Sequence, residues 1–417
     1  MAEYDQVNSF LHYGYVPKKG GGFGFQDRLS KSFLENNSRD GWQTEASIRE
    51  VFKQGVGHLR NLIDDPGEGD HVVPLSGGLD SRAILGVLLD RLSADRVTAI
   101  TCGIPGTLDF EIGHQVADFA GIEVTTVDLS ALTWKTGALV DFAAEIGQPV
   151  VIFDAYMYSR VLAEGGGEPT YWSGFMGDPL AGSHLRKKAI SNWEAARLNF
   201  AESNEFAFSR SLTSDEYHPE AVLPKDPIAA IDVLSASEQL DFVVRQWDFI
   251  RPQVLLDGYE IKAPFLNPDW VQFILSIPDA YRRNQRAYKK ILQEAYPDLF
   301  SLPVKSNVGL PLDASPLRKH SKRVLEFLKR MGRRLGVPGL GVDPRLNYID
   351  VSAAIRSGSL RSVVHENLVD LQKRDLISWV DIEEIWKEHQ SGRADHANAL
   401  DVLTSLEIHL KAGTFDA

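Results

Sequence analysis

The sequence predicts an α/β fold in which a twisted, parallel β-sheet carries helices on both faces and is followed by a mostly helical C-terminal part. Between residues 71 and 173, short apolar segments alternate with segments in which apolar residues recur every three to four positions. Such an alternation of strands and helices is typical of βαβ units, whose strands run parallel. Beyond about residue 185 the strand patterns stop, and helical patterns interrupted by prolines follow.

Each element can be placed along the chain. Residues 1–40, rich in glycine and aromatic side chains, are expected to be an irregular lead-in, and the apolar spacing over 44–63 predicts a helix. The remaining expectations are strands at 71–75, 97–102, 123–129 and 170–173, and helices at 81–92, 110–120, 139–146, 156–163, 315–336, 379–389 and 399–410. The chain is thus divided into a lead-in with its helix (1–65), an α/β core (66–185) and a mostly helical part that completes the substrate site (186–417).

The amino-acid composition excludes several classes of protein. The 417 residues are 43% hydrophobic and 24% charged, which is ordinary for a soluble globular protein. A net charge of −13 argues against nucleic acid as a partner. The single cysteine excludes a disulfide framework and a cysteine-based zinc cluster. Neither a secretory signal nor an apolar run of membrane-spanning length is evident, so the expected location is cytoplasmic, with no membrane partner.

A six-residue loop, Ser76-Gly77-Gly78-Leu79-Asp80-Ser81, follows the first expected strand and precedes a helix. Its glycines allow close approach of the backbone, and the helix N-terminus carries partial positive charge, so the loop suits an anion such as phosphate. The alternative is a plain strand–turn–helix joint that Asp80 caps. A Walker-type loop is excluded because its lysine is missing. Ligands of parallel sheets bind at the carboxyl ends of strands, so the loops at 102–109 and 173–182 are expected to lie beside this one.

The hexapeptide SGGLDS after a strand resembles the PP-loop of ATP pyrophosphatases, which cleave ATP between its α- and β-phosphates. More narrowly, the chain resembles the synthetase domain of the asparagine synthetase family from about residue 10 to residue 410. Five blocks carry the resemblance: FLHYGYVP (10–17), TCGIPGTLDFEIGHQVADFAGIEV (101–124), SGFMGDPLAG (173–182), GYEIKAPFLNPDWVQFILSIP (258–278) and KKILQEAYPDLFSLPVKSNVGLPL (289–312). The resemblance implies the PP-loop, HUP-like form of the α/β fold.

The resemblance also implies site residues. Asp80 and Asp178 match the two metal-side aspartates of the family, and Mg²⁺ prefers carboxylates together with phosphate oxygens. Lys305 matches the lysine placed against pyrophosphate and the developing oxyanion, and Lys289 matches a second phosphate-binding lysine on a helix. Taken alone, each aspartate is typical of a cap or turn and each lysine of a solvated surface. The expected ATP contacts are Leu75, Ser76, Gly77, Gly78, Asp80, Ser81, Cys102, Gly103, Ser173 and Gly174.

The sequence departs from the family pattern around its second motif. Phe175 replaces a Glu or Tyr that assists deprotonation of the nucleophile, and phenylalanine can act as neither acid nor base. His184 and Glu205 are candidates to supply that base, with a solvent-exposed histidine as the plain alternative. Pro179 replaces a glutamate and Asn267 an aspartate, which leaves the identity of the substrate open.

A further departure concerns the nitrogen source. Ala2 stands where glutamine-hydrolysing members carry a catalytic cysteine, and the domain that begins with that cysteine is not found. The expected nitrogen donor is therefore free ammonia, ammonia from a separate protein, or an amine.

The leading hypothesis is an ATP-dependent, AMP- and pyrophosphate-forming amide ligase. It would adenylate a small-molecule carboxylate and transfer the acyl group to ammonia or an amine, in a biosynthetic pathway for a sugar uronic acid, a peptide or another natural product. The alternatives are a PP-loop enzyme that modifies tRNA and a non-catalytic ATP-binding subunit. A homo-oligomer is compatible with the sequence. The basic segment 315–336 is expected to form an amphipathic helix with a solvated basic face, or to meet an anionic partner.

Overall fold

The fold is built on one parallel β-sheet. A computed structural model describes residues 2–18, 23–30, 45–186, 190, 192–334, 337, 339 and 341–415. The sheet has five strands in the order β3-β2-β1-β4-β5, and each neighbouring pair is parallel. The strands are β1 (His71–Pro74), β2 (Val97–Gly103), β3 (Glu123–Asp128), β4 (Thr170–Trp172) and β5 (Ile261–Lys262). His71 of β1 is in register with Val97 on one side and Thr170 on the other, so β1 lies at the centre.

Helices cover both faces of the sheet because successive strand residues point to opposite sides. Val73 and Ala99 enter one apolar cluster, whereas Val72 and Ile100 enter the other. The first cluster is built with α4 (Glu45–Arg60), α5 (Asp80–Leu89), α6 (Leu108–Ala120), α13 (Pro268–Ser276) and α15 (Arg286–Ala295). The second is built with α1 (Ala2–Tyr13), α7 (Thr136–Ile146), α8 (Phe153–Ala163), α19 (Gly358–Arg374), α20 (Ile382–Gln390) and α21 (Ala397–Ala412). The predicted α/β fold class is therefore confirmed.

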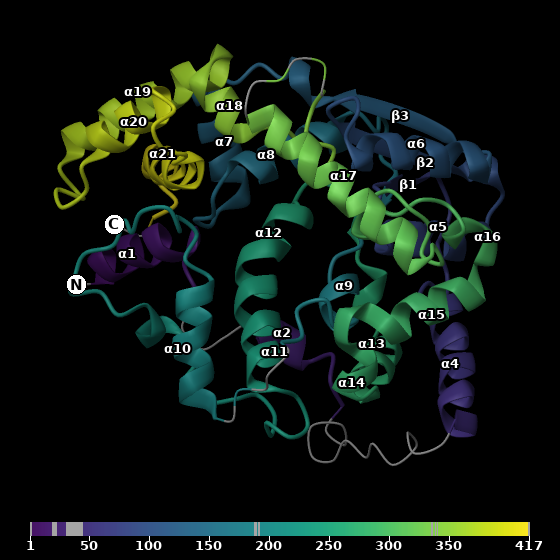
Figure 1. Cartoon of the computed structure of the whole chain (residues 1–417). Helices are drawn as coiled ribbons and strands as arrows, with labels where there is room; N and C mark the ends of the chain where they lie inside the picture. Colours follow the sequence, from purple (N-terminus) through teal and green to yellow (C-terminus); the bar gives the residue numbers. More distant parts are fainter. Residues whose placement is uncertain are drawn as a thin grey trace.

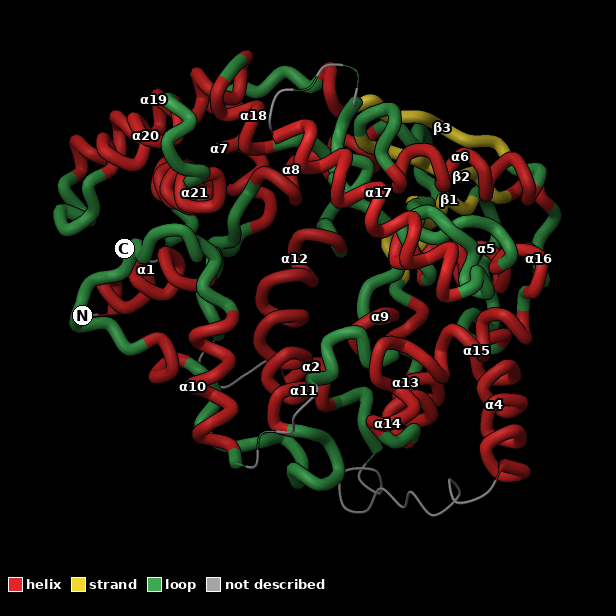
Figure 2. Tube along the Cα trace, in the orientation of Figure 1, coloured by secondary structure: helices red, strands yellow, loops and turns green. Residues whose placement is uncertain are grey.

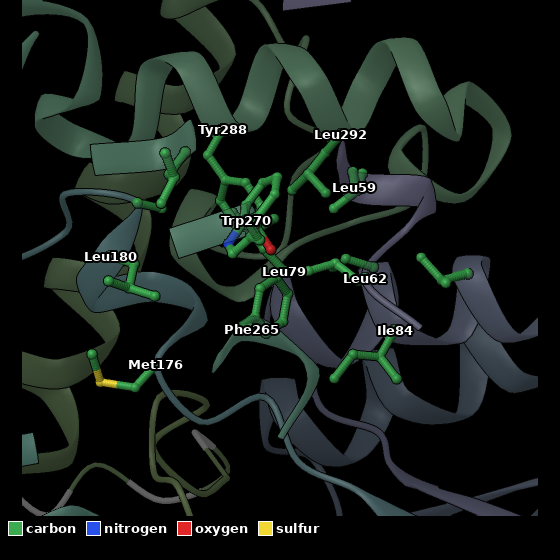
Figure 3. Packing of buried hydrophobic residues seen from close by; sticks show 14 of the residues in the cluster. Leu59, Leu62, Leu79, Ile84, Met176, Leu180, Phe265, Trp270, Tyr288 and Leu292 are labelled. Carbon is green, nitrogen blue, oxygen red and sulfur yellow. The ribbon is translucent and has the colours of Figure 1, made fainter. Parts of the chain in front are cut away.

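Large side chains fix the first cluster. Trp270, Phe265 and Tyr288 meet beneath α15 with ring centroids about 6 Å apart, as Figure 3 shows. α6 lies unusually close to the sheet at Gly113, where a Cβ would come within 2.5 Å of the Thr101 hydroxyl and 2.7 Å of the Leu75 carbonyl oxygen. A larger residue at that position would push the helix off the strand ends that form the site.

The later part of the chain is helical, as predicted, but it also contributes to the sheet through β5. Residues 236–254 form one continuous helix made of α11 (Ala236–Leu240), a π-helical stretch (Asp241–Ile250) and α12 (Arg251–Val254). Figures 1 and 2 show this helix below the sheet. The short helix α9 (Gly177–Leu180) precedes this part, which also contains α10 (Trp193–Ser203), α14 (Asp279–Arg282), α16 (Pro297–Phe300), α17 (Pro316–Arg334) and α18 (Val351–Arg356).

The expectation of an irregular lead-in over 1–40 is wrong at its start. Residues 2–13 form helix α1, and Phe10 and Leu11 are fully buried in the second cluster. Val7, Phe10 and Leu11 have helical spacing, which the glycines and aromatics that follow obscured. Residues 23–26 form the short helix α2 (Phe23–Gln26), and residues 19–22 and 31–44 lie outside the described part of the chain.

The expected helix at 315–336 forms as α17, and the basic residues Arg318 and Arg323 are exposed, but its apolar side is exposed as well, which the expectation of an amphipathic helix did not include. Leu317, Val324, Leu325 and Leu328 are exposed, whereas the side chains of Glu326 and Arg333 are largely buried. The polar side of the helix faces a cavity that the loops at 105–108 and 341–345 also line. Leu335 lies outside the described residues. Within the residues that the structure describes, no helix is both long and apolar enough to cross a lipid bilayer.

Candidate active site

A cleft of about 470 Å³ opens at the carboxyl ends of β1, β2 and β4. The loops after these three strands form its floor, and the helix over 236–254, the Lys305 segment and residues 347–348 form its walls. Ten residues singled out from the sequence line it together: Leu75, Ser76, Gly78, Asp80, Ser81, Cys102, Ser173, Gly174, Asp178 and Lys305. Three others do not line the cleft, namely Gly77, Gly103 and Lys289.

The loop after β1 holds its N–H donors against side-chain oxygens. The Ser76 N–H donates to the Ser81 hydroxyl (3.3 Å), and the Gly78 N–H donates to the Ser76 hydroxyl (3.2 Å). The Gly77 N–H donates to the carboxylate of Asp109 (3.0 Å), a residue that sequence reasoning did not select. A Cβ at Gly77 would lie 3.1 Å from the Leu108 carbonyl oxygen, so the loop packs tightly behind the cleft. One donor of this loop, the Gly77 N–H, thus already binds an anionic group.

Asp80 and Asp178 are brought together in the cleft. Burial, and next the neighbouring charge of Asp178, raise the pKa of Asp80 to about 8, although the Tyr288 hydroxyl donates to Asp80 Oδ1 at 2.8 Å. Burial likewise raises the pKa of Asp178. Asp80 is the first residue of α5 and not its cap, because Leu79 occupies the N-cap position. Two carboxylates in such surroundings need a proton or a cation between them.

The carboxylate pair fits an open cation site. Within the described residues, no group of three or more His, Cys, Asp or Glu side chains could hold a metal. A closed structural site, as zinc requires, is therefore not formed there. Mg²⁺ is commonly held by one or two carboxylates and completes its shell with water and substrate phosphates, and Asp80 and Asp178 supply such a donor set.

Lys305 reaches the cleft on a short helical turn, Lys305–Asn307, that is tied to the first loop. Its backbone N–H donates to the Gly77 carbonyl oxygen (2.8 Å), and its ammonium group donates to Asp109 and to the side-chain oxygen of Asn347. The buried guanidinium of Arg82, on α5, donates to the carbonyl oxygens of Leu299 (3.1 Å) and Pro303 (2.7 Å) just before this turn. These contacts hold Lys305 beside the loop after β1, at the wall of the cleft.

Lys289 is not brought to the cleft. Its ammonium group donates to the Asn284 carbonyl oxygen (2.9 Å), and burial, with the nearby charge of Lys319, lowers its pKa. The preceding residue, Tyr288, is the one that contacts Asp80, because adjacent residues on a helix point about 100° apart. The expectation of a phosphate contact from Lys289 therefore finds no support in the geometry.

Of the two residues expected on the adenine side, Cys102 lines the cleft and Gly103 does not. Cys102 is half-buried at the end of β2 and lines the cleft, and burial, then Asp109, raise the pKa of its thiol to about 12. Such a thiol is not a nucleophile at neutral pH. Gly103 turns the chain with φ +131° but does not line the cleft. Sequence reasoning missed Tyr158 and Tyr348, which line the cleft near Cys102 and which only the folded chain brings together.

The positions that depart from the family pattern fall into two groups. Phe175 is buried at the cleft wall, with its ring centroid 6.4 Å from that of Trp247, and Pro179 also lines the cleft. Asn267 lies outside the cleft: its side chain accepts hydrogen bonds from the backbone N–H groups of residues 269 (2.9 Å) and 270 (3.4 Å) and so caps α13. Aspartate would cap the helix in the same way, so this substitution affects the N-terminus of α13 and not the lining of the cleft.

His184 lies beyond Asp178, on the edge of a second cavity of about 340 Å³. Its Nδ1 is 2.8 Å from the carboxylate of Asp241, which also accepts a hydrogen bond from Gln246 (3.3 Å) in the cleft wall. Burial alone would lower the pKa of His184, but the hydrogen bond and charge of Asp241 outweigh burial and raise it. The other candidate base, Glu205, lines neither cavity. It lies near His12, where its charge acts to raise the histidine pKa against the larger effect of burial.

Comparison with known proteins agrees with this geometry. The sequence model of the family described as asparagine synthase matches residues 70–330, which include all five strands, the two aspartates and Lys305. A comparison with curated proteins gives no match. Because the match covers more than half of the chain and contains the whole cleft-forming sheet, the chain belongs to the asparagine synthase family, that is, to the ATP-dependent ligases that form carbon–nitrogen bonds.

Proposed function

We propose that this chain adenylates a small-molecule carboxylate and passes the acyl group to ammonia or an amine. The observation that carries the proposal is the half-buried Asp80–Asp178 pair in a cleft that Lys305 also lines. A carboxylate is a poor electrophile, and adenylation turns it into a good one. The substrate oxygen attacks the α-phosphorus of ATP and pyrophosphate leaves with the bridging oxygen. The nitrogen then attacks the acyl carbon, AMP leaves, and the nitrogen loses a proton.

The residues of the first step have distinct tasks. Asp80 and Asp178 would hold Mg²⁺, which when bound offsets the negative charge of the triphosphate. Lys305 and the Gly77 N–H both bind Asp109 and are therefore already arranged to receive an anion. We propose that a phosphate group of ATP in the cleft takes the ammonium group of Lys305 from Asp109. A fixed ammonium group beside the leaving pyrophosphate stabilises charge that develops in the transition state.

For the second step we propose that His184 is the base that deprotonates the nitrogen nucleophile, because Phe175, at the position of the family's polar residue, has no group that accepts a proton. Asp241 accepts the Nδ1 proton, which leaves Nε2 as the nitrogen that can take a proton from the amine. The charge of His184 acts to lower the pKa of Asp178, against the larger effect of burial, and the charge of Asp178 acts to raise the pKa of His184. The His184–Asp241 pair therefore lies close to the metal-side carboxylates. Under this proposal, a separate protein can supply the ammonia. The carboxylic acid substrate belongs to a biosynthetic pathway.

The test is exchange of radiolabelled pyrophosphate into ATP, with Mg²⁺ and a panel of carboxylates. Exchange that requires one particular acid is expected, since it reports reversible adenylation and also identifies the substrate. Asp178→Asn should abolish exchange, whereas Asp118→Asn, at an exposed aspartate of α6, should leave it unchanged. Persistent exchange in Asp178→Asn would refute the metal assignment. ATP binding without exchange for any acid would favour the non-catalytic subunit.

The role of His184 is tested by separating the two steps. His184→Asn should keep pyrophosphate exchange while amide formation falls by about a hundredfold or more, which is the usual contribution of a general base. Amide formation in the variant should recover in part at higher pH, where more of the amine is unprotonated. An equal fall in both steps would show that His184 supports the fold of the cleft and not the transfer.

A further inference from the structure

Helix α17 presents its apolar side to solvent. Among its residues Leu317 is 76% exposed, Leu328 59% and Phe327 52%, and Val324, Leu325 and Met331 are exposed by more than two fifths. In Figure 1 the helix crosses the front of the molecule as one uninterrupted rod. A helix that only covered a core would place such residues inward. These six side chains are called the α17 apolar face below.

The inner side of α17 is polar and makes polar contacts. Lys319 donates to the Leu312 carbonyl oxygen (2.9 Å), and Glu326 pairs with Lys329 (3.4 Å) and Lys322 (3.7 Å). Arg333 lies 3.9 Å from Asp343. Between this side and the loops at 105–108 and 341–345 a cavity of about 350 Å³ remains. Two of these contacts, from Lys319 and Arg333, reach residues outside the helix, so rotating it to bury its apolar face would break them.

The α17 apolar face is broad and has cations at its edges. At 100° per residue, its six members span an arc of roughly 160°. Arg318 and Arg323, both exposed, flank the two edges of this arc. The helix carries eight Lys or Arg residues and a single acidic one, within a chain of net charge −13. Basic charge on this protein is thus concentrated where apolar side chains are exposed.

We propose that α17 is an in-plane anchor for an anionic lipid surface. A helix with a wide apolar face of Leu, Phe and Met, and with Lys or Arg at its borders, inserts its apolar side between lipid headgroups while the cations meet lipid phosphates. A protein helix would be met by a narrower seam with complementary charges at its flanks. A second copy of the same helix would bring like charges together. This proposal replaces the expectation that the chain has no membrane partner, and it does not depend on the proposed function.

The test measures cosedimentation of the full chain with vesicles of phosphatidylcholine, with or without phosphatidylglycerol. Binding is expected only with the anionic lipid, and it should weaken as salt is added. Leu325→Glu combined with Leu328→Glu should lower the partition coefficient by at least about tenfold, because two apolar groups no longer enter the lipid. Leu198→Glu, at an exposed leucine of α10, is the matched control and should bind like the wild type.

Other outcomes would overturn the proposal. One is equal binding to both kinds of vesicle, another is no binding to vesicles of pure phosphatidylglycerol, and a third is an equal loss in Leu198→Glu. Concentration-dependent self-association that the Leu325→Glu, Leu328→Glu variant abolishes would assign the α17 apolar face to a second copy of the chain instead. Circular dichroism and the unfolding midpoint confirm that each variant is folded, which is expected because the substituted side chains are exposed.

Discussion

The carboxylate of Asp80 gives the metal-free protein a specific dependence on pH. Burial and the charge of Asp178 raise the pKa of Asp80 from 3.8 to about 8, so between these values the folded chain keeps a proton that the unfolded chain releases. The free energy of unfolding should therefore contain a contribution that is complete at low pH and is lost as the pH rises towards about 8. Asp80→Asn removes this contribution.

The measurement compares the unfolding midpoint of wild type and Asp80→Asn across this pH range, in the presence of a chelator. The difference between the two proteins isolates Asp80 from other carboxyls such as the buried Asp248, whose pKa burial also raises. Wild type should lose stability relative to the variant as the pH rises, and added Mg²⁺ should restore it most at the upper end. Parallel pH profiles would show that Asp80 does not titrate in this window.

At the same scale, sequence reasoning locates residues that a motif contains and misses those that only folding brings near. Asp80, Asp178 and Lys305 lie within short recognisable blocks, and the structure places all three in the cleft. Tyr288 lies outside these blocks, and Asp109 lies inside one without being marked as a site residue, although each contacts a group singled out from the sequence. Their roles depend on helix rotation and on contacts between residues that are far apart in the sequence, which spacing along one chain does not encode.

At the scale of elements, the periodicity of apolar residues predicts which segments form strands or amphipathic helices. It does not predict which face of a helix is buried. Strands β1 to β4 start where expected because β-branched apolar runs bounded by turn signals leave few alternatives, whereas the two-residue strand β5 was not expected. Helix α17 was predicted from the same periodicity, yet its apolar side faces solvent. The pattern specifies two faces of a helix, but tertiary contacts decide which of them is buried, and here Lys319 and Arg333 contact residues outside the helix from its polar side.

The joint between β4 and α9 is the element on which the carboxylate pair depends. A Cβ at Gly177 would lie 2.5 Å from Asp80 Cγ, so glycine is required for α9 to start against Asp80. Gly177→Ala should displace the carboxylate and reduce pyrophosphate exchange by at least about tenfold, since misplacing a reacting group by an ångström is costly. Gly137→Ala on α7, where a Cβ has open space, is the control and should retain full exchange. Unchanged exchange in Gly177→Ala would mean that Asp80 need not hold its position.

At the scale of the whole molecule, the segment that carries the first motif depends on the segments that follow it. β4 pairs with β5 from far along the chain, and α13 and α15 bury the same apolar cluster as α5. Two buried arginines link these parts: Arg82 donates to carbonyl oxygens at 299–303, and Arg282 donates to the Leu180 carbonyl oxygen (3.0 Å) and to Glu238 (2.7 Å). The division at residue 185 that the sequence suggested therefore cuts through one core.

A fragment of residues 66–185 should consequently fail to fold by itself. It would expose the α5 side of the first cluster, lose the edge strand β5, and leave the buried guanidinium of Arg82 without the carbonyl oxygens that it binds in the full chain. An unpartnered buried charge and a half-exposed core each cost several kcal/mol, which is of the order of a domain's whole stability. Calorimetry should show a cooperative transition for the full chain and none for the fragment. A sharp transition in the fragment, with slow hydrogen exchange in β1 and β2, would instead establish residues 66–185 as an independent domain.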